Sequence, residues 1–261
     1  MPHTDTTSLE PILSTFNPIG LEEMKTVRLM NRVDQKYITS LDSLPQLLST
    51  IAPEYSVQRI DGEAFASYRT LYFDTPGLEM YTHHHNKKLT RQKVRVRCYR
   101  SSMTTFFEIK NKNNKKKTKK VRVPLAVELF NTPFADSEVR DFLHDKTPYS
   151  GDCLVRHLEN NFRRITLVDH GFNERVTIDS GITFHNHLTG NDCDISNLVI
   201  LEVKHEVGAP SSPIERTLRD MRIHPNRVSK YCIGTVFTNP SAKSNRFKHK
   251  IRLINKITNA N

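Results

Sequence analysis

The stretch KVRVRCYR, residues 93–100, alternates cationic with small or apolar side chains. Lys93, Arg95 and Arg97 occupy every second position. Successive side chains of a β-strand point to opposite faces, so this stretch predicts a strand with one cationic and one apolar face. Like charges on one face of a sheet repel each other unless an anion lies against them. The stretch therefore predicts an anion-binding sheet face.

The same alternation recurs along the chain. Together with KVRVRCYR, these segments predict about eight antiparallel strands; the others cover residues 33–37, 66–74, 104–112, 119–125, 162–168, 174–182 and 197–207. Residues 111–120, NKNNKKKTKK, are typical of a hairpin tip between two basic strands. Helical spacing, with narrow apolar stripes, is seen in other segments, at residues 20–31, 40–52, 136–145 and 213–222, and a shorter apolar segment covers 228–237.

The positive charge is concentrated in one part of the chain. The 261 residues carry a formal net charge of +11. Residues 87–122 contain fifteen Lys and Arg against a single acid, Glu108. The basicity therefore indicates a local site whose partner is a polyanion. The basic segment 243–256 is more typical of a solvated tail or helix than of a surface for nucleic acid or an anionic membrane. No nucleic-acid motif accompanies it, so sequence-specific nucleic-acid binding is not expected.

Targeting and metal-site signals are weak. The first residues show no secretory signal pattern, and no apolar run approaches the ~20 residues of a membrane span. The four cysteines lack CxxC spacing, which favours neither a zinc site nor a disulfide framework and fits a cytoplasmic protein. The consecutive histidines 83–85 are expected at a loop tip. We expect an extension at 1–19, one domain at 20–240 and a basic segment at 241–261.

The predicted strands admit two architectures. A single antiparallel sheet with one face in water also alternates polar and apolar residues. The polar faces here, however, hold ionised groups of both signs and are rich in Arg, and the helices need an apolar surface to cover. An α+β fold satisfies both demands: a closed, eight-stranded antiparallel β-barrel with helices packed outside and charges gathered in the lumen. Charges enclosed in this way require an ionic ligand.

Short motifs in a fixed order resemble a known family. The motifs are NRVDQKY, RTLYFDT, KVRVRCYR, FFEIK, FRRITL, ERVTID, LEVK and NRVSKY. Their order is similar to that of the VTC domain, the polyphosphate polymerase domain of the vacuolar transporter chaperone complex. That domain is a triphosphate tunnel metalloenzyme with an eight-stranded antiparallel barrel. The resemblance extends from about residue 20 to residue 240.

The resemblance implies a role for each matched charge. The catalytic and phosphate-binding residues it implies are Lys36, Arg95, Arg97, Lys110, Arg164, Arg175 and Lys230. Further phosphate contacts are implied for Lys120, Arg122, Lys204, Arg227 and Ser229. Glu202 matches the family's metal-binding glutamate, for Mn²⁺ or Mg²⁺. Glu108 is a second metal candidate, although it is also placed to pair with a neighbouring Arg.

The function that the resemblance implies is ATP-dependent polyphosphate synthesis, with ATP and polyphosphate as the ligands. Two alternatives stay open: a tunnel hydrolase of triphosphate or polyphosphate, and a non-catalytic polyphosphate-binding module. The presence of the metal-binding Glu202 argues against a non-catalytic binding module. Arg32, which stands where the wider superfamily has the first Glu of ExExK, argues against the hydrolase. The chain has no sensor or membrane helices like those of the yeast complex, so a membrane-protein partner would act in trans.

Overall fold

The computed structural model describes residues 6–24, 32–115 and 117–258. Much of the predicted helix at 20–31 and the side chain of Arg32 lie outside the described part. Within it, a helix over the start of the 20–31 segment is present as α2 (Leu21–Met24).

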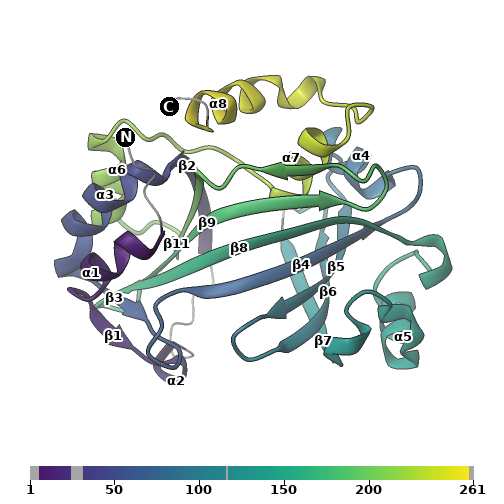
Figure 1. The fold of residues 1–261 in the computed structure, drawn as a ribbon, viewed down its shortest axis with the longest axis horizontal. Coiled ribbons are helices and arrows are strands. Elements are labelled where there is room, and N and C mark those ends of the chain that lie inside the picture. The colour runs from purple at the N-terminus through teal and green to yellow at the C-terminus, as the bar shows by residue number, and fades with distance from the viewer. Residues whose placement is uncertain (1–5, 25–31, 116, 259–261) are drawn as a thin grey trace.

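The predicted strands are confirmed as one large, mainly antiparallel sheet (Figure 1). Its main path runs through eight strands in the order β2 (Arg32–Ser40), β11 (Leu198–Glu206), β9 (Glu174–Asn186), β8 (Val155–Asp169), β4 (Ala66–Asp74), β5 (Arg91–Tyr99), β6 (Thr104–Lys112) and β7 (Thr118–Leu125). Three short strands join it at the side: β1 (Asn17–Ile19), β3 (Tyr55–Gln58) and β10 (Asp192–Asp194). β6 and β7 form a hairpin, as predicted, and the described residues 113–115 and 117 lie at its tip.

The sheet is curled but not closed into a barrel. β2 and β7 are the two ends of the strand order, and no ladder joins them in the described ranges. Pairing them would bring Lys120 and Arg122 of β7 toward Lys36 on the concave face, and like charges opposite each other destabilise a strand pair. The curl still brings strands that are distant in the sheet order close to one another. Lys110 on β6 interacts electrostatically with Glu202 on β11 and Lys36 on β2.

Two helical layers cover the convex, apolar face of the sheet, as the alternation predicts. At one side, α1 (Glu10–Leu13), α3 (Leu44–Ile51) and α6 (Pro213–Asp220) pack over β11, β9 and β8 around buried residues such as Leu48 and Ile178. At the other side, α5 (Ser137–Lys146) packs over β6 and β7 through Val139 and Leu143. α5 begins where Asp136 accepts hydrogen bonds from two backbone amides of its first turn, as an N-cap does.

Three helices differ from the prediction that all helices lie outside. α4 (Glu79–His85), α7 (Lys230–Thr238) and α8 (Lys248–Thr258) gather over one end of the curled sheet (Figure 1). α7 packs against concave-face residues, among them Phe162 and Phe184. α7 can occupy this position because it is buried on most sides and has no wet face to keep outward. The concave side therefore has an apolar end and a charged remainder.

Close packing of α7 depends on Gly234. A Cβ at this position would lie 2.4 Å from the ring of Phe184 and 2.7 Å from Leu158. We expect Gly234→Ala to lower the free energy of unfolding by about 1–3 kcal/mol, the usual cost of overpacking a core. Urea denaturation would measure the loss. Gly77→Ala is the matched control, since a Cβ there meets nothing within 4 Å; equal effects at both positions would contradict the packing argument.

Two local predictions have different outcomes. The loop tip expected at residues 83–85 is wrong: these histidines form the last turn of α4, where His85 is fully buried. Consecutive residues of a helix point in different directions, so His83 faces Glu79 at 3.4 Å while His84 turns away from it. The basic segment near the C-terminus contains helix α8, which is one of the two alternatives predicted. No described helix has the length and hydropathy needed to span a membrane.

Candidate functional site

The concave face of the sheet carries most of the charges predicted from the motifs. Strand register sets Arg95 opposite Glu108, Lys93 opposite Lys110, and Glu202 opposite Lys36. These residues alternate with buried apolar neighbours such as Val94, whose side chain lies on the convex face. The pleat of the strands thus positions the charged row, as the period of two in KVRVRCYR predicts.

Glu108 lies at the centre of the first ion-pair group. Its side chain is 1% exposed, and it accepts from Arg95 Nη2 at 2.6 Å and from Lys120 Nζ at 3.1 Å. Burial opposes its ionisation, but the charges of Arg95, Arg97 and Lys120 outweigh burial and lower the pKa of Glu108 to about 2. Glu108 is therefore an ionised partner of cations, which is the alternative that the sequence left open for it.

Glu202 holds a second group together. Its two carboxylate oxygens lie 2.6 Å from Lys36 Nζ and 2.6 Å from Lys204 Nζ. Asp34 lies 3.4 Å from Lys204 Nζ. Burial opposes ionisation of Glu202, but Lys36 and Lys204 hold the pKa of its carboxyl well below the ordinary value. The carboxylate is thus charged and in contact with two of the predicted phosphate ligands.

Asp179 forms a third group that the sequence reasoning missed. Arg164 forms a bidentate pair with Asp179, donating from Nε to Oδ1 at 2.6 Å and from Nη2 to Oδ2 at 2.8 Å. Lys230, at the first turn of α7, also bonds Oδ2 of Asp179. The signal for Asp179 was present, because it shares the polar phase of ERVTID with Arg175 and Thr177.

The remaining predicted residues vary in how closely they join these groups. Arg97 donates from Nε to Thr70 Oγ1 at 3.2 Å, and Arg175 is the cross-strand neighbour of Lys204. Arg122 stacks at 4.0 Å over the ring of Phe106.

The late motif NRVSKY is only partly brought to the site. Ser229 caps the first turn of α7, and its hydroxyl accepts a hydrogen bond from Lys93 Nζ at 2.7 Å. Lys93 is not among the phosphate-binding residues that the motifs predict. Arg227 is exposed, and the contact that the structure shows for it uses its backbone carbonyl, which accepts from Lys250.

One amide side chain on the concave face is buried without a hydrogen-bond partner. Asn160, on β8 and opposite Thr70, is completely buried. Neither its side-chain oxygen nor its nitrogen has a hydrogen-bond partner within the described ranges. A buried polar group without a partner costs free energy that a ligand could recover. Nothing in the sequence pattern distinguished this Asn from its neighbour Asn161.

Three lysines of the site are held in a poorly hydrated environment. Burial is the main cause that lowers the pKa of Lys93, Lys110 and Lys230 to about 8 each, from 10.5. Neighbouring cations add to the effect, such as Arg95 beside Lys93 and Arg164 beside Lys230. Keeping these lysines charged in the site therefore costs stability.

The lowered values predict how stability depends on pH. Between about pH 8 and 10.5 the unfolded chain binds more protons than the folded one, so the free energy of unfolding of the ligand-free protein should rise with pH. Binding of tripolyphosphate should weaken over the same range, by up to about tenfold per pH unit for each lysine that must be charged. Denaturation and calorimetry at pH 7.5, 8.5 and 9.5 would test both trends. Lys110→Met should make both the rise in stability and the loss of binding with pH smaller. A free energy of unfolding that falls between pH 8 and 9.5 would contradict the lowered pKa values of these lysines.

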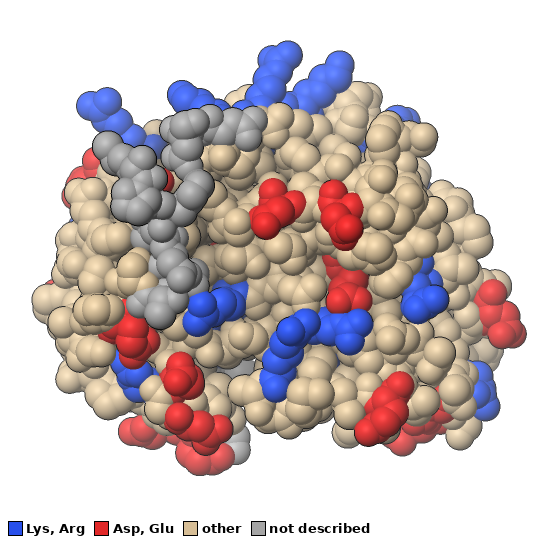
Figure 2. Space-filling view, viewed as in Figure 1, with Lys and Arg blue, Asp and Glu red and all other residues tan. Residues whose placement is uncertain are grey.

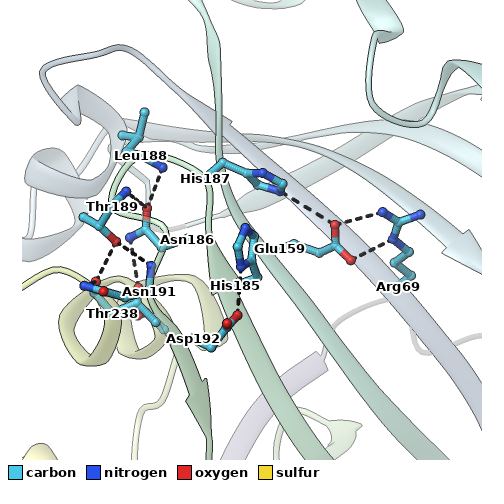
Figure 3. Close-up of polar contacts among 11 residues, drawn as sticks. Arg69, Glu159, His185, Asn186, His187, Leu188, Thr189, Asn191, Asp192 and Thr238 are labelled. Carbon is cyan, nitrogen blue, oxygen red and sulfur yellow. Dashed lines mark hydrogen bonds and ion pairs between the residues drawn. The ribbon is translucent and has the colours of Figure 1, made fainter.

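A separate polar cluster occupies the other side of the sheet (Figure 3). Arg69 binds Glu159 through Nε at 2.7 Å and Nη2 at 3.0 Å, and His187 lies 3.7 Å from the same carboxylate. His185 bonds Asp192 at 2.8 Å. The strand parity that points Thr70 to the concave face points Arg69 away from it, so this cluster supplies no group to the charged site.

The described residues contain no group of three or more His, Cys, Asp or Glu arranged to hold a metal ion. Glu202 nevertheless has the chemistry of a ligand for Mg²⁺ or Mn²⁺, which prefer oxygen donors and share them with phosphates. A divalent ion would fit here with Glu202 as its protein ligand and phosphate oxygens completing the shell. The carboxylate would then exchange a lysine contact for the ion.

The profile of the VTC domain matches residues 31–239. The chain belongs to the VTC domain family. Among solved structures, this VTC domain is similar to a proposed adenylyl cyclase from Hippeastrum, described as having a dominant triphosphatase activity. The two share 14% identity with a TM-score of 0.46, over 80% of this chain and 97% of that one.

A second similar structure is a proposed adenylate cyclase from Vibrio parahaemolyticus. It shares 9% identity with a TM-score of 0.45, over 79% of this VTC domain and 99% of that chain. No curated protein matches the sequence.

Proposed function

We propose that this VTC domain is a metal-dependent polyphosphate polymerase that transfers the γ-phosphoryl group of ATP to the end of a phosphate chain. One observation carries the proposal: the motif cations line one concave face, interrupted by three carboxylates that are each bonded to two of them. Glu108 and Asp179 are buried, and Glu202 is partly buried. A nucleoside triphosphate and a phosphate chain are both polyanions, and this face offers cations to both. The proposal also rests on membership of the VTC family.

In the proposed reaction, an oxygen at the chain end attacks the γ-phosphorus of ATP. A new P–O bond forms, the bond from the γ-phosphorus to the bridging oxygen breaks, and ADP leaves with that oxygen. Phosphoryl transfer of this kind depends mainly on positioning and charge stabilisation. We assign positioning of phosphate oxygens to the guanidinium forks of Arg95, Arg97 and Arg164, whose planar donors match pairs of oxygens.

The lysines have a role that complements that of the arginines in this proposal. Lys36, Lys110, Lys120, Lys204 and Lys230 supply point charges that follow the phosphates as they move. A bound Mn²⁺ or Mg²⁺ would neutralise charge on the transferred group, with Glu202 as its protein ligand. Glu108 and Asp179 are proposed to keep Arg95 and Arg164 in fixed orientations, because each carboxylate bonds its guanidinium at two or more contacts.

Full closure of the barrel is part of the proposal. A polyanion between the sheet ends would neutralise the like charges of β2 and β7, and so would remove the repulsion that opposes their approach. A closed lumen would also exclude water, which competes with the chain end for the phosphoryl group. We place the reaction in the cytoplasm, because a reducing compartment fits four cysteines that are all free.

The test is incubation of the purified domain with ATP and Mn²⁺, followed by gel analysis of the phosphate chains. Chains that lengthen with time, with ADP released in equal amount, are the expected result. Release of inorganic phosphate without chains would support a tunnel hydrolase instead. Binding of polyphosphate with no turnover under either metal would support a non-catalytic module.

A further inference from the structure

A second group of cations lies at the end of the sheet covered by α4 and α8 and adjoins the central site at Lys93. Arg91 and Lys93 open strand β5, and Lys112 ends the neighbouring strand β6, where it is the register partner of Arg91. Lys250 reaches the same region from α8. These residues come from three elements, and β5 continues from them directly to Arg95 and Arg97.

His84 lies on α4, which packs against β5, and it interacts electrostatically with all four of these cations. Burial is the main cause that lowers the pKa of His84 to about 2, and the next four causes are the positive charges of Lys93, Arg91, Lys250 and Lys112. Its Nδ1 atom is buried and has no hydrogen-bond partner among the described residues. A neutral imidazole with Nδ1 protonated could donate one hydrogen bond to an anion, and that bond would satisfy the buried atom.

The same cations act on a neighbouring buried group. Burial raises the pKa of the Cys232 thiol on α7, and the positive charges of Lys93, Arg91 and Lys250 oppose this increase. Burial and the positive charges of Lys87 and Arg227 lower the pKa of Lys250 itself. A set of cations this close together repels itself in the absence of an anion.

The position of the group matters for its ligand. The cationic row of β5 spans about 20 Å from Arg97 to Arg91 at ~3.3 Å per residue, and about 13 Å of this lies beyond Arg95. Figure 2 shows Lys and Arg side chains standing out along the top edge of the molecule, over α8. The row therefore leads from the central site toward a basic surface.

We propose that His84, Arg91, Lys112 and Lys250 form a second phosphate-binding site, which holds the part of a polyphosphate chain that extends beyond the central site. The ligand class is a linear phosphate polymer longer than a triphosphate. The inference rests on the proposed function for the identity of the chain. It adds that chain length is sensed at the α4–α8 end of the sheet.

The test compares binding of sodium tripolyphosphate and of long-chain polyphosphate by calorimetry at ~0.15 M salt, where distant charges are screened. The variant is Arg91→Gln with Lys250→Gln. The matched control is Arg252→Gln with Lys256→Gln, which removes the same charge from exposed positions, both on α8. We expect the site variant to bind tripolyphosphate within about twofold of the parent and to lose about tenfold or more of the parent's preference for the long chain. The control should retain that preference.

Three results would overturn the second site: a preference unchanged in the site variant, an equal loss for both ligands, or an equal loss in the control variant. Melting curves of both variants without ligand verify that each is folded. The outcome is independent of turnover. A domain that binds long chains through Arg91 and Lys250 but never extends them with ATP would refute the polymerase and leave this site standing.

Discussion

Arg97→Gln should weaken binding of tripolyphosphate by roughly 10- to 100-fold without destabilising the empty protein. The loss corresponds to one charge-assisted phosphate contact, about 1.5–3 kcal/mol. Arg97 is partly buried close to Arg95 and Arg164, and desolvation together with the charge of Arg95 lowers the pKa of its guanidinium. Its removal therefore relieves repulsion in the ligand-free site. Calorimetry with tripolyphosphate and a melting curve without it would measure the two effects.

The control for this experiment is Arg100→Gln. Arg100 directly follows β5, is exposed, and donates to Asn161 Oδ1 at 2.9 Å. It loses the same charge at the end of the same strand, so its affinity for tripolyphosphate should stay within about twofold of the parent. Unchanged binding in Arg97→Gln would place Arg97 outside the ligand site. Arg95 is a poorer choice for this test, because its loss would leave buried Glu108 with Lys120 alone.

Glu202→Gln should lower ATP-dependent chain synthesis by about 100-fold or more, the scale on which loss of a group that stabilises transition-state charge is felt. The amide is isosteric with the carboxylate but is a poor ligand for a divalent cation. Binding of tripolyphosphate without metal should be retained or tighter, because one negative charge leaves a cationic site. Turnover per folded molecule, measured with Mn²⁺, and binding measured with a chelator would separate the two.

A purely structural role for Glu202 makes a different prediction. The ion pairs to Lys36 and Lys204 give it a contribution to the fold, so the variant would melt at a lower temperature and keep its turnover per folded molecule. Glu159→Gln provides the comparison, since Glu159 also pairs with a cation but on the opposite face. Glu159→Gln should lose stability alone. Retained turnover in Glu202→Gln would remove Glu202 from the metal site.

The period of two in the sequence was sufficient to predict the strands and the face on which their charges lie. In KVRVRCYR and in ERVTID the sequence alone shows which residues share a face, because the alternation of side chains along a strand is a local property. The pairing of Asp179 with Arg164 and Lys230 could not be read in the same way. It depends on strand register and on α7 crossing to the concave side, and both are set by contacts distant in sequence.

The placement of α7 and the curl of the sheet are further examples. The sequence KYCIGTVFT is apolar on most sides, so its pattern carries no information about which face of a sheet it covers. The sheet's closure depends on the balance between backbone pairing of β2 with β7 and repulsion among their side chains. That balance changes with the ligand, which is not part of the sequence.

An open sheet has two free edges, and each is protected here against pairing with another chain. The β2 edge is partly covered by the segment before α7, where Asn226 donates its backbone amide to the Lys36 carbonyl at 2.6 Å. The β7 edge carries exposed Lys119 and also Pro124, which has no amide to donate. Lysine and proline on an edge strand are features that hinder intermolecular β-sheet growth. Neutralising the lysines of β7, by acetylation or by a tightly bound polyanion, would remove part of that protection, so aggregation of the purified domain should depend on the charge state of this one edge.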